Sequence, residues 1–267
     1  MSEKTGPLFE RLVQIMATLR APGGCPWDRE QTRESLKAFL IEEAYEVLEA
    51  LDQGGKEKLQ EELGDLLLQI VFHAQVAAEL GEFTVDEVLE DVTDKLVRRH
   101  PHVFGESRAE TAVEVLSNWE KLKQAERGGA IQASALSGVP KTLPALLRAQ
   151  RLQDKASRVG FDWGETSEVL QKVEEELNEL KAAMGKKSET IEAELGDLLF
   201  SLVNLARFLN LNAEEALRKT IEKFTRRFRH IESVIAEQGK SLAESNLEEM
   251  DMLWREAKIG EDSGGGR

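Results

Sequence analysis

Leucine, alanine and other apolar residues recur at spacings of three and four along most of this chain, with Glu, Lys and Arg between them. This spacing is typical of amphipathic α-helices, which complete a turn about every 3.6 residues. β-Branched residues rarely alternate with polar ones, and the chain holds only one Tyr and six Pro. The pattern therefore predicts an all-α protein.

Glycines, prolines and capping motifs divide this pattern into separate helices. Gly81 ends one helix, the capping box from Thr84 to Glu87 starts the next, and Pro101 stops that helix at His100. Another capping box begins at Thr111. The predicted helices cover residues 8–20, 30–53, 56–80, 84–100, 111–127, 143–157, 166–184, 188–209, 213–237 and 246–258.

The two halves of the chain carry the same motifs in the same order. EEAYE at 42–46 corresponds to EELNE at 175–179, and ELGDLL at 62–67 returns at 194–199. An internal duplication explains this repeat. The sequence therefore predicts two tandem helical-bundle domains at 1–127 and 140–260, joined by a small, polar linker at 128–139 and followed by a disordered tail at 261–267.

Each repeated motif carries two acids three residues apart, which lie on one face of a helix. Two such helices packed together would bring four carboxylates into one place, and no basic residue within the motifs is placed to neutralise them. A hard divalent cation, Mg²⁺ or Mn²⁺, would supply the counter-charge and leave positions for phosphate oxygens. The acids are Glu176, Glu179, Glu194 and Asp197 in the second half and Glu43, Glu46, Glu62 and Asp65 in the first.

Two other interpretations fit parts of this pattern. Glutamates at helical spacing also solvate an exposed helix face, but Asp197 lies among leucines, where an unpaired carboxylate is costly to bury. A di-iron bundle uses a Glu three residues before a His, and none of the four histidines has that neighbour. The repeated acids therefore favour a site for a hard cation.

Basic and aromatic residues follow the acidic motifs in both halves. Two pairs, Lys223 with Arg227 and Lys95 with Arg99, lie four residues apart on one helix face. Such pairs could contact phosphate oxygens or serve as ordinary surface charge. The tryptophans near the end of each half, Trp254 and Trp119, could stack on a base or pack in a core.

The helix faces beyond the acids differ between the halves. Asn204 and Arg207 lie seven and ten residues after Asp197 and share its face, whereas the aligned positions of the first half hold Phe72 and Gln75. Polar groups for a substrate are therefore expected in the second half, which makes it the predicted principal active site.

Composition and charge limit the partners of the protein. The chain has 35 basic and 50 acidic residues, a net charge of −15, which argues against nucleic-acid or anionic-membrane binding. No apolar run reaches the ~20 residues that span a bilayer, and the start lacks an apolar signal core. Cys25 is the only cysteine, and no His lies close in sequence to activate it as a nucleophile. We expect a cytoplasmic protein.

In these motifs the chain resembles the MazG family of nucleoside triphosphate pyrophosphohydrolases, within the all-α NTP pyrophosphatase superfamily. The resemblance covers nearly the whole chain. Besides the acidic motifs it rests on CPWD at 25–28, RRHPHVFG at 98–105, GFDW at 160–163, VNLAR at 203–207 and EKFTRRF at 222–228.

The resemblance implies two MazG-like domains and a homodimer whose helical bundles form the pocket jointly. It also implies a house-cleaning enzyme that uses Mg²⁺ to hydrolyse (d)NTPs between the α and β phosphates, releasing NMP and pyrophosphate. Carried over by motif, the catalytic metal ligands are Glu176, Glu179, Glu194 and Asp197, and the substrate contacts are Lys223, Arg227 and Trp254. The first half completes a second set with Glu43, Glu46, Glu62, Asp65, Lys95 and Arg99.

A function of a different class fits the same residues. Because one half has lost pocket residues, the protein could be a non-catalytic helical module that senses nucleotides or alarmones, or that binds a partner protein. Turnover of a nucleotide with Mg²⁺ separates the enzyme from this module.

Overall fold

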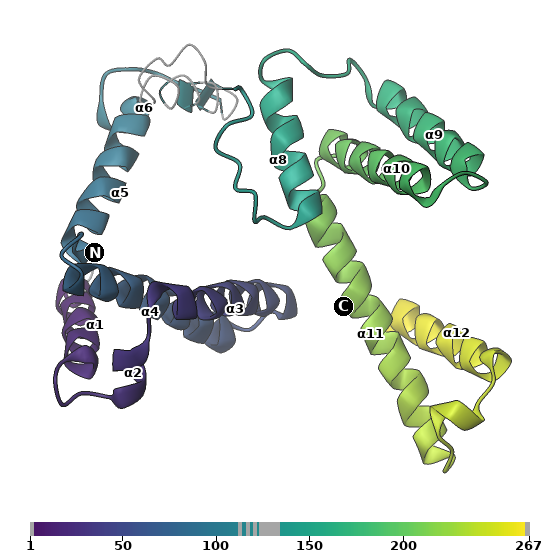
Figure 1. The fold of residues 1–267 in the computed structure, drawn as a ribbon, viewed down its shortest axis with the longest axis horizontal. Coiled ribbons are helices and arrows are strands. Elements are labelled where there is room, and N and C mark those ends of the chain that lie inside the picture. Colours follow the sequence, from purple (N-terminus) through teal and green to yellow (C-terminus); the bar gives the residue numbers. More distant parts are fainter. Residues whose placement is uncertain (1–2, 112–113, 116–117, 120–121, 123–133, 265–267) are drawn as a thin grey trace. The chain divides into compact units, whose positions relative to one another are not determined.

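The computed structural model describes residues 3–111, 114–115, 118–119, 122 and 134–264. Every regular element in this part of the chain is a helix, which confirms the all-α prediction. The chain divides into two compact units, unit 1 at Met1–Gly129 and unit 2 at Ala130–Arg267 (Figure 1). None of the helices within the described ranges is long and apolar enough to cross a membrane.

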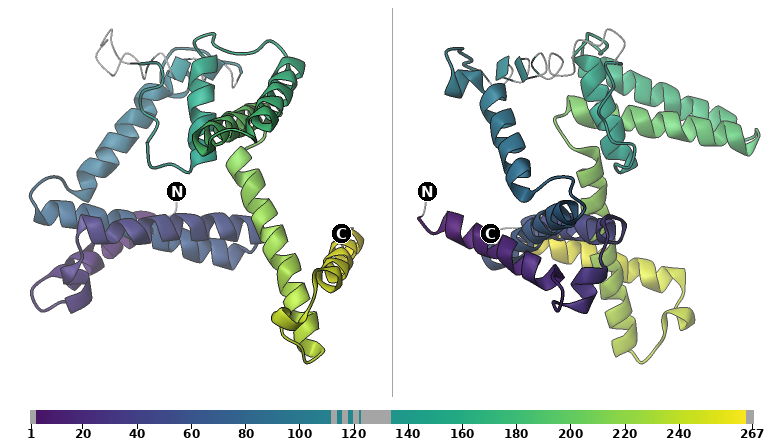
Figure 2. Two further views of the ribbon diagram at one scale, coloured as in Figure 1. Left: turned by 45° about the vertical axis from the view of Figure 1, so that its right-hand side comes forward. Right: turned by 60° about the vertical axis from the view of Figure 1, so that its left-hand side comes forward.

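Unit 1 is built on a hairpin of two long helices. Its helices are α1 (Thr5–Arg20), α2 (Pro26–Glu30), α3 (Arg33–Gln53), α4 (Lys56–Glu79), α5 (Val85–Arg99) and α6 (Pro101–Phe104). Helices α3 and α4 lie side by side, because Gly54 and Gly55 adopt positive φ angles of 69° and 139° and reverse the chain between them (Figures 1 and 2). Both acidic motifs of the first half lie on this hairpin.

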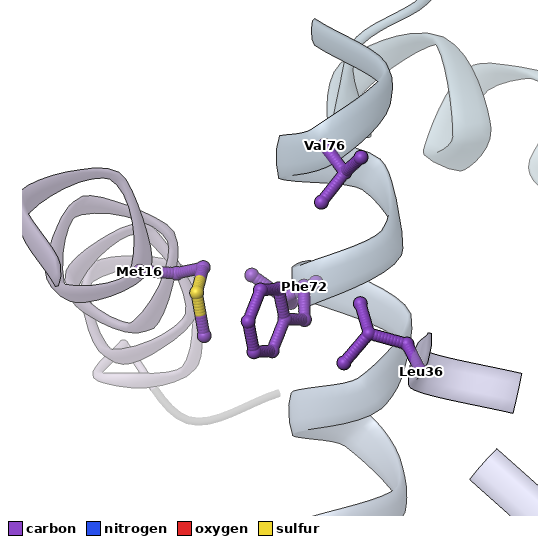
Figure 3. Packing of buried hydrophobic residues seen from close by; sticks show 5 residues of the cluster. Met16, Leu36, Phe72 and Val76 are labelled. Carbon is purple, nitrogen blue, oxygen red and sulfur yellow. The ribbon is translucent and has the colours of Figure 1, made fainter. Parts of the chain in front are cut away.

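Helix α1 closes the apolar side of this hairpin. The side chain of Met16 on α1 points toward Phe72 on α4, and Leu36 and Val76 pack around the same ring (Figure 3). Phe72 is only 3% exposed. The space between α1, α3 and α4 is therefore filled by apolar side chains.

Unit 2 repeats the hairpin and adds a second helix pair. Its helices are α8 (Ala145–Ser157), α9 (Thr166–Ala183), α10 (Ser188–Phe208), α11 (Ala213–Glu237) and α12 (Leu247–Gly264), with a 3₁₀ turn, η1 (Leu242–Glu244). Helices α9 and α10 lie side by side, α8 packs on α10, and α12 folds back along α11 (Figures 1 and 2). A core of Ile231, Ile235 and Leu253 holds α11 and α12 together.

The capping box predicted at Thr84 is confirmed. The Thr84 hydroxyl accepts from the Glu87 N–H at 3.4 Å, and the Glu87 carboxylate accepts from the Thr84 N–H at 2.7 Å. Helix α5 ends at Arg99, before Pro101, as predicted. The predicted helix at 111–127, the start of the linker at 128–139 and the last residues of the tail lie largely outside the described residues.

Several helix boundaries differ from the predictions. The helix predicted from residue 30 begins instead at Arg33, because Thr32 and Ser35 form a capping box that separates it from α2. Pro101 stops α5 but also opens the short helix α6, since proline suits the first turn of a helix. Helix α12 continues to Gly264, beyond its predicted end at Lys258.

Candidate active site

The α9–α10 hairpin brings three carboxylates of unit 2 together. Glu176 on α9 and Glu194 and Asp197 on α10 each offer an oxygen, and these oxygens all lie within 4.8 Å of one another. Glu176 is buried, with 7% of its surface exposed. The helical spacing therefore brings together three of the four predicted acids, in a donor set of oxygens alone that suits a hard divalent cation.

Unit 1 holds the corresponding cluster on α3 and α4. Oxygens of Glu43, Glu62 and Asp65 lie within 4.8 Å of one another, and Glu62 is 2% exposed. The Gln69 side chain, one turn after Asp65, hydrogen-bonds to Glu43. The duplication has thus preserved the acidic cluster in both units.

The fourth predicted acid of each unit, Glu179 or Glu46, stands outside the group of three. Burial, followed by the charges of Glu176 and Glu194, raises the pKa of Glu179. Burial and then the charges of its acidic neighbours, including Glu46, likewise raise the pKa of Glu43. The fourth acid is therefore close enough to interact electrostatically with the group of three.

A lysine just outside each motif pairs with one acid of each cluster, although the motifs themselves contain no basic residue. Lys172 lies 2.8 Å from the carboxylate of Glu176, and Lys58 forms an ion pair with Glu62. Each lysine precedes its glutamate by one helical turn, a spacing that favours such pairs and that is visible in the sequence. The lysines come from different helices of the hairpin, α9 in unit 2 and α4 in unit 1.

A cavity of about 610 Å³ adjoins the acidic cluster of unit 2. Lys172, Glu176 and Asp197 line it, together with Asn204 and Arg207. The predicted sharing of one α10 face by Asp197, Asn204 and Arg207 is therefore confirmed. Apolar side chains from α8, α9 and α10 form much of the remaining wall.

The loop at 160–164 forms another wall of this cavity through Phe161, Asp162 and Trp163. Gly160 turns the chain out of α8 with a φ of 87°, and the Phe161 N–H caps the helix by donating to the Ala156 carbonyl at 3.1 Å. At the other end, the carboxylate of Glu168 accepts from the Gly164 and Glu165 N–H groups. The loop is therefore fixed at both ends.

Arg207 ties this loop to α10. Its guanidinium donates to both carboxylate oxygens of Asp162, with one distance of 3.0 Å, and to the Asn204 side-chain oxygen at 3.0 and 2.8 Å. Arg207 thus shapes the cavity wall through its neighbours. Direct contact of Asn204 and Arg207 with a substrate stays a prediction.

The remaining predicted contacts lie on the other helix pair of unit 2. Arg227 on α11 stacks over the Trp254 ring of α12 at 5.5 Å, and Trp254 also contacts Phe224. These residues and Lys223 are not among those that line the cavity in the described chain. Unit 1 keeps a similar pair, since Arg99 stacks over Trp119 at 5.9 Å, and Lys95 lies exposed on α5.

Comparison with known proteins places this architecture in a family. The model of the MazG nucleotide pyrophosphohydrolase domain matches twice, at residues 31–104 and 163–232. Both matches include the acidic cluster of their unit. The repeat seen in the sequence is therefore a repeat of one domain.

Two relatives that match over nearly their full length agree with this assignment, and a third matches over about half of its own length. The nucleoside triphosphate pyrophosphohydrolase/pyrophosphatase MazG of Thermotoga maritima is 48% identical over 261 residues, covering 98% of this chain and all of the relative. The nucleoside triphosphate pyrophosphohydrolase of Escherichia coli is 46% identical over 94% of this chain and 97% of its own length. The uncharacterised protein YabN of Bacillus subtilis is 48% identical over 94% of this chain and 51% of its own. The chain therefore belongs to the MazG family of nucleotide pyrophosphohydrolases.

Proposed function

We propose that this protein is a Mg²⁺-dependent nucleoside triphosphate pyrophosphohydrolase that cleaves (d)NTPs between the α and β phosphates, with its principal active site in unit 2. The observation that carries this proposal is the position of the acidic cluster of unit 2 at the wall of a cavity of about 610 Å³. That volume lies within the range of small-molecule sites, about 300–1,000 Å³. The names of the relatives in T. maritima and E. coli support the reaction class.

The residues of unit 2 fit a bound Mg²⁺ ion. Glu176, Glu194 and Asp197 would hold it through carboxylate oxygens, which Mg²⁺ prefers, and Glu179 would add negative charge beside them. When bound, Mg²⁺ supplies Lewis-acid polarisation of phosphoryl oxygens and lowers the pKa of water. Mn²⁺ would fit the same ligands.

The side chains around the cluster have different roles in this function. Lys172 offers a positive charge at the cavity wall next to Glu176, where a polyphosphate would approach the acids. Asn204 and the Arg207–Asp162 pair hold the loop at 160–164 against α10. The cavity therefore combines an acidic end for a metal–phosphate group with apolar walls for a nucleoside.

We include Lys223, Arg227 and Trp254 in this function through a homodimer, because they do not line the cavity of their own chain. The surface of α11 supports a partner, since Leu217, Ile221 and Phe224 recur on one helix face and are 48%, 53% and 56% exposed. An exposed apolar stripe of this kind is typical of a protein interface. The expected cytoplasmic location likewise stays a prediction.

Pyrophosphate release tests the reaction and its location. The wild type, Asp197→Asn and the matched variant Asp65→Asn are assayed on a panel of NTPs and dNTPs with Mg²⁺. We expect Asp197→Asn to lose about 100-fold or more, the effect of removing an electrostatic contact to a transition state. Asp65→Asn is expected to keep most of the activity.

Two other results of this assay would lead to different conclusions. A larger loss in Asp65→Asn than in Asp197→Asn would place the principal active site in unit 1. Tight nucleotide binding without pyrophosphate release at any divalent metal would support the sensing module instead of the enzyme.

A further inference from the structure

The segment between the two matches to the MazG domain contributes a side chain to the cavity of unit 2. Residues 134–139 fall in the predicted linker and lie outside both matches, at 31–104 and 163–232. They belong nevertheless to the compact unit 2, which begins at Ala130. Leu136 in this segment lines the cavity. The wall of the candidate active site therefore includes a residue from outside the repeated domain.

A tight turn holds Leu136 in this segment. The Ser137 N–H donates to the Ser134 carbonyl at 2.9 Å, and the Leu136 N–H donates to the Ser134 hydroxyl at 3.2 Å. Gly138 follows with a φ of 85°, in the region that favours glycine. Serine side chains that accept from a nearby backbone N–H are a common feature of turns. The segment is therefore a folded turn and not an extended connection.

Two prolines restrict the chain between this turn and α8. Pro140 and Pro144 each have a fixed backbone φ, and Pro144 is the residue directly before α8. The chain that leads into α8 runs alongside this helix (Figures 1 and 2). The turn therefore stays close to the helix that forms one wall of the cavity.

Leu136 and two aromatic residues leave large apolar surfaces open in this cavity. The exposed fractions are 42% for Leu136, 46% for Trp163 and 48% for Phe200, and all three residues line the cavity. Removing apolar surface from water is favourable, so a ligand that covers these side chains gains affinity. Because solvent already reaches them, a ligand in the cavity can reach them as well.

The chemistry of the cavity separates the two parts of a nucleoside triphosphate. Asp197 and Arg207 line the cavity from one face of α10 and are ten residues apart, about 15 Å along the helix axis. Asp197 and Lys172 suit the metal–phosphate group, whereas an apolar side chain cannot replace the water around a charged phosphate. The ring faces of a nucleoside are apolar. The nucleoside is therefore the part of the substrate that fits Leu136.

We propose that Leu136 packs against the nucleoside of the bound triphosphate, so that the turn at 134–138 is part of the active site, an inference that rests on the proposed function. Leu136 binds the substrate without taking part in the reaction, since it has no polar group. Loss of apolar contact in a binding pocket weakens binding by about tenfold or more. The loss falls on KM, because the contact is the same in the ground state and the transition state.

Leu136→Ala in the full-length protein tests this contact. With Mg²⁺ and ATP as the substrate, we expect KM to rise about tenfold and kcat to change little. Leu136→Met, which keeps the apolar bulk, should have a KM near that of the wild type. Leu136→Gln, which keeps the length of the side chain but adds an amide, should raise KM as Leu136→Ala does.

Inorganic tripolyphosphate separates a contact to the nucleoside from a general effect on the cavity. It carries the phosphates of the substrate without a nucleoside. Its inhibition constant against ATP should therefore be the same in the wild type and in Leu136→Ala, although KM for ATP differs between them.

Val139→Ala is the matched control. Val139 lies in the same segment and is partly buried, but it is not among the residues that line the cavity in the described part of the chain. We expect this variant to keep the wild-type KM. Thermal unfolding of all variants shows whether any change has disrupted the fold.

The outcomes separate this inference from the proposed function. An unchanged KM for ATP in Leu136→Ala, or an equal weakening of ATP and tripolyphosphate, would overturn the contact between Leu136 and the nucleoside. A wild type that binds ATP with Ca²⁺ in calorimetry but releases no pyrophosphate with any divalent metal would contradict the proposed function alone. The ATP affinities of the wild type and Leu136→Ala, measured in the same way, would then still test the contact.

Discussion

Arg207 on α10 and Asp162 in the loop before α9 form a two-point ion pair across the cavity wall of unit 2. The Arg207 side chain is 14% exposed and that of Asp162 is 26% exposed, so water screens the pair only in part. Planar two-point pairs of this kind fix geometry as well as charge. The position of the loop, and with it Trp163, therefore depends on Arg207.

Asp162→Asn should raise KM for nucleoside triphosphates about tenfold and change kcat less, because the loop would lose its attachment while the acidic cluster stays intact. Steady-state kinetics measure this split. A double-mutant cycle that combines Asp162→Asn with Arg207→Gln should show a coupling of about 0.5–3 kcal/mol in the free energy of unfolding. Asp154→Asn is the control, since Asp154 pairs with Arg151 at 3.6 Å in an i,i+3 surface pair that contributes little. Equal kinetics for both variants would contradict the role of the ion pair.

Lys172→Met should destabilise the metal-free protein by about 1–2 kcal/mol, because it leaves Glu176 buried without its counter-charge. This is less than for a fully buried pair, since Lys172 is 33% exposed. Hydrogen bonds to Glu175 and then Glu176 raise the pKa of Lys172 above the ordinary 10.5, so its stabilising effect persists through the neutral range and is lost only at high pH. Urea unfolding with and without Mg²⁺ should show a larger gain from Mg²⁺ in the variant. An equal stabilisation by Mg²⁺ in the wild type and in Lys172→Met would contradict the role of Lys172 as the counter-charge of Glu176.

Divalent cations should stabilise the protein through both acidic clusters. Mg²⁺ or Mn²⁺ well above its dissociation constant should raise the free energy of unfolding by about 1.4 kcal/mol per tenfold increase in concentration for each cluster that binds one ion. Glu176→Gln should remove the contribution of unit 2, and Glu62→Gln that of unit 1. Thermal unfolding in EDTA and in NaCl of matched ionic strength provides the controls. A full metal effect in the double variant would exclude these clusters as the binding sites.

Phe72→Ala should cost about 3–5 kcal/mol, the usual range for removing a buried aromatic ring. Phe72 is 3% exposed and packs against Met16 and Leu36. Asn204→Ala, the aligned change in unit 2, should cost less, about 1–2 kcal/mol, because it removes an acceptor for Arg207 but leaves no cavity in an apolar core. Urea unfolding of the full chain measures both. Similar costs would contradict the difference in packing between the units.

Glu79 should contribute to stability in a pH-dependent way. The hydrogen bond from Arg20 lowers the pKa of Glu79, so its contribution is present above the ordinary pKa of 4.5 and is lost as the pH falls through the lower folded value. Glu79→Gln should therefore destabilise the protein by roughly 1 kcal/mol at pH 7, and the difference from wild type should shrink below pH 4.5. Glu82→Gln, in a more exposed pair with Arg33, should have a smaller effect. A constant difference in the free energy of unfolding between the wild type and Glu79→Gln from pH 7 to pH 3 would contradict this role of Glu79.

Local signals in the sequence predict most of the helices but not every boundary. Thr84 with Glu87 is a familiar capping box, and the structure forms it. Thr32 with Ser35 caps α3 in the same way, but a serine at the third position is a weaker signal than a glutamate. Pro26 lies between the predicted helices at 8–20 and 30–53, but it begins the short helix α2, since proline suits the first turn of a helix.

The acidic clusters are predictable because helical spacing alone fixes which side chains share a face. The ion pair between Arg207 and Asp162 is not, because it depends on how the loop after α8 packs on α10, and no local period encodes that contact. Lys172 and Lys58 were missed for another reason. They lie outside the repeated motifs, one turn before the glutamate that each of them contacts.

The placement of these two lysines means that the hairpins are no longer exchangeable parts. The position on α3 that aligns with Lys172 holds Phe39, which packs into the core of unit 1, and the position on α10 that aligns with Lys58 holds Thr190. A chimaera of α3 with α10 would contain the acids with neither lysine, and a chimaera of α9 with α4 would contain both. Recombination between the two copies would therefore produce one hairpin with too little positive charge beside its acids and one with too much. Each acidic cluster thus depends on the two helices of its own unit.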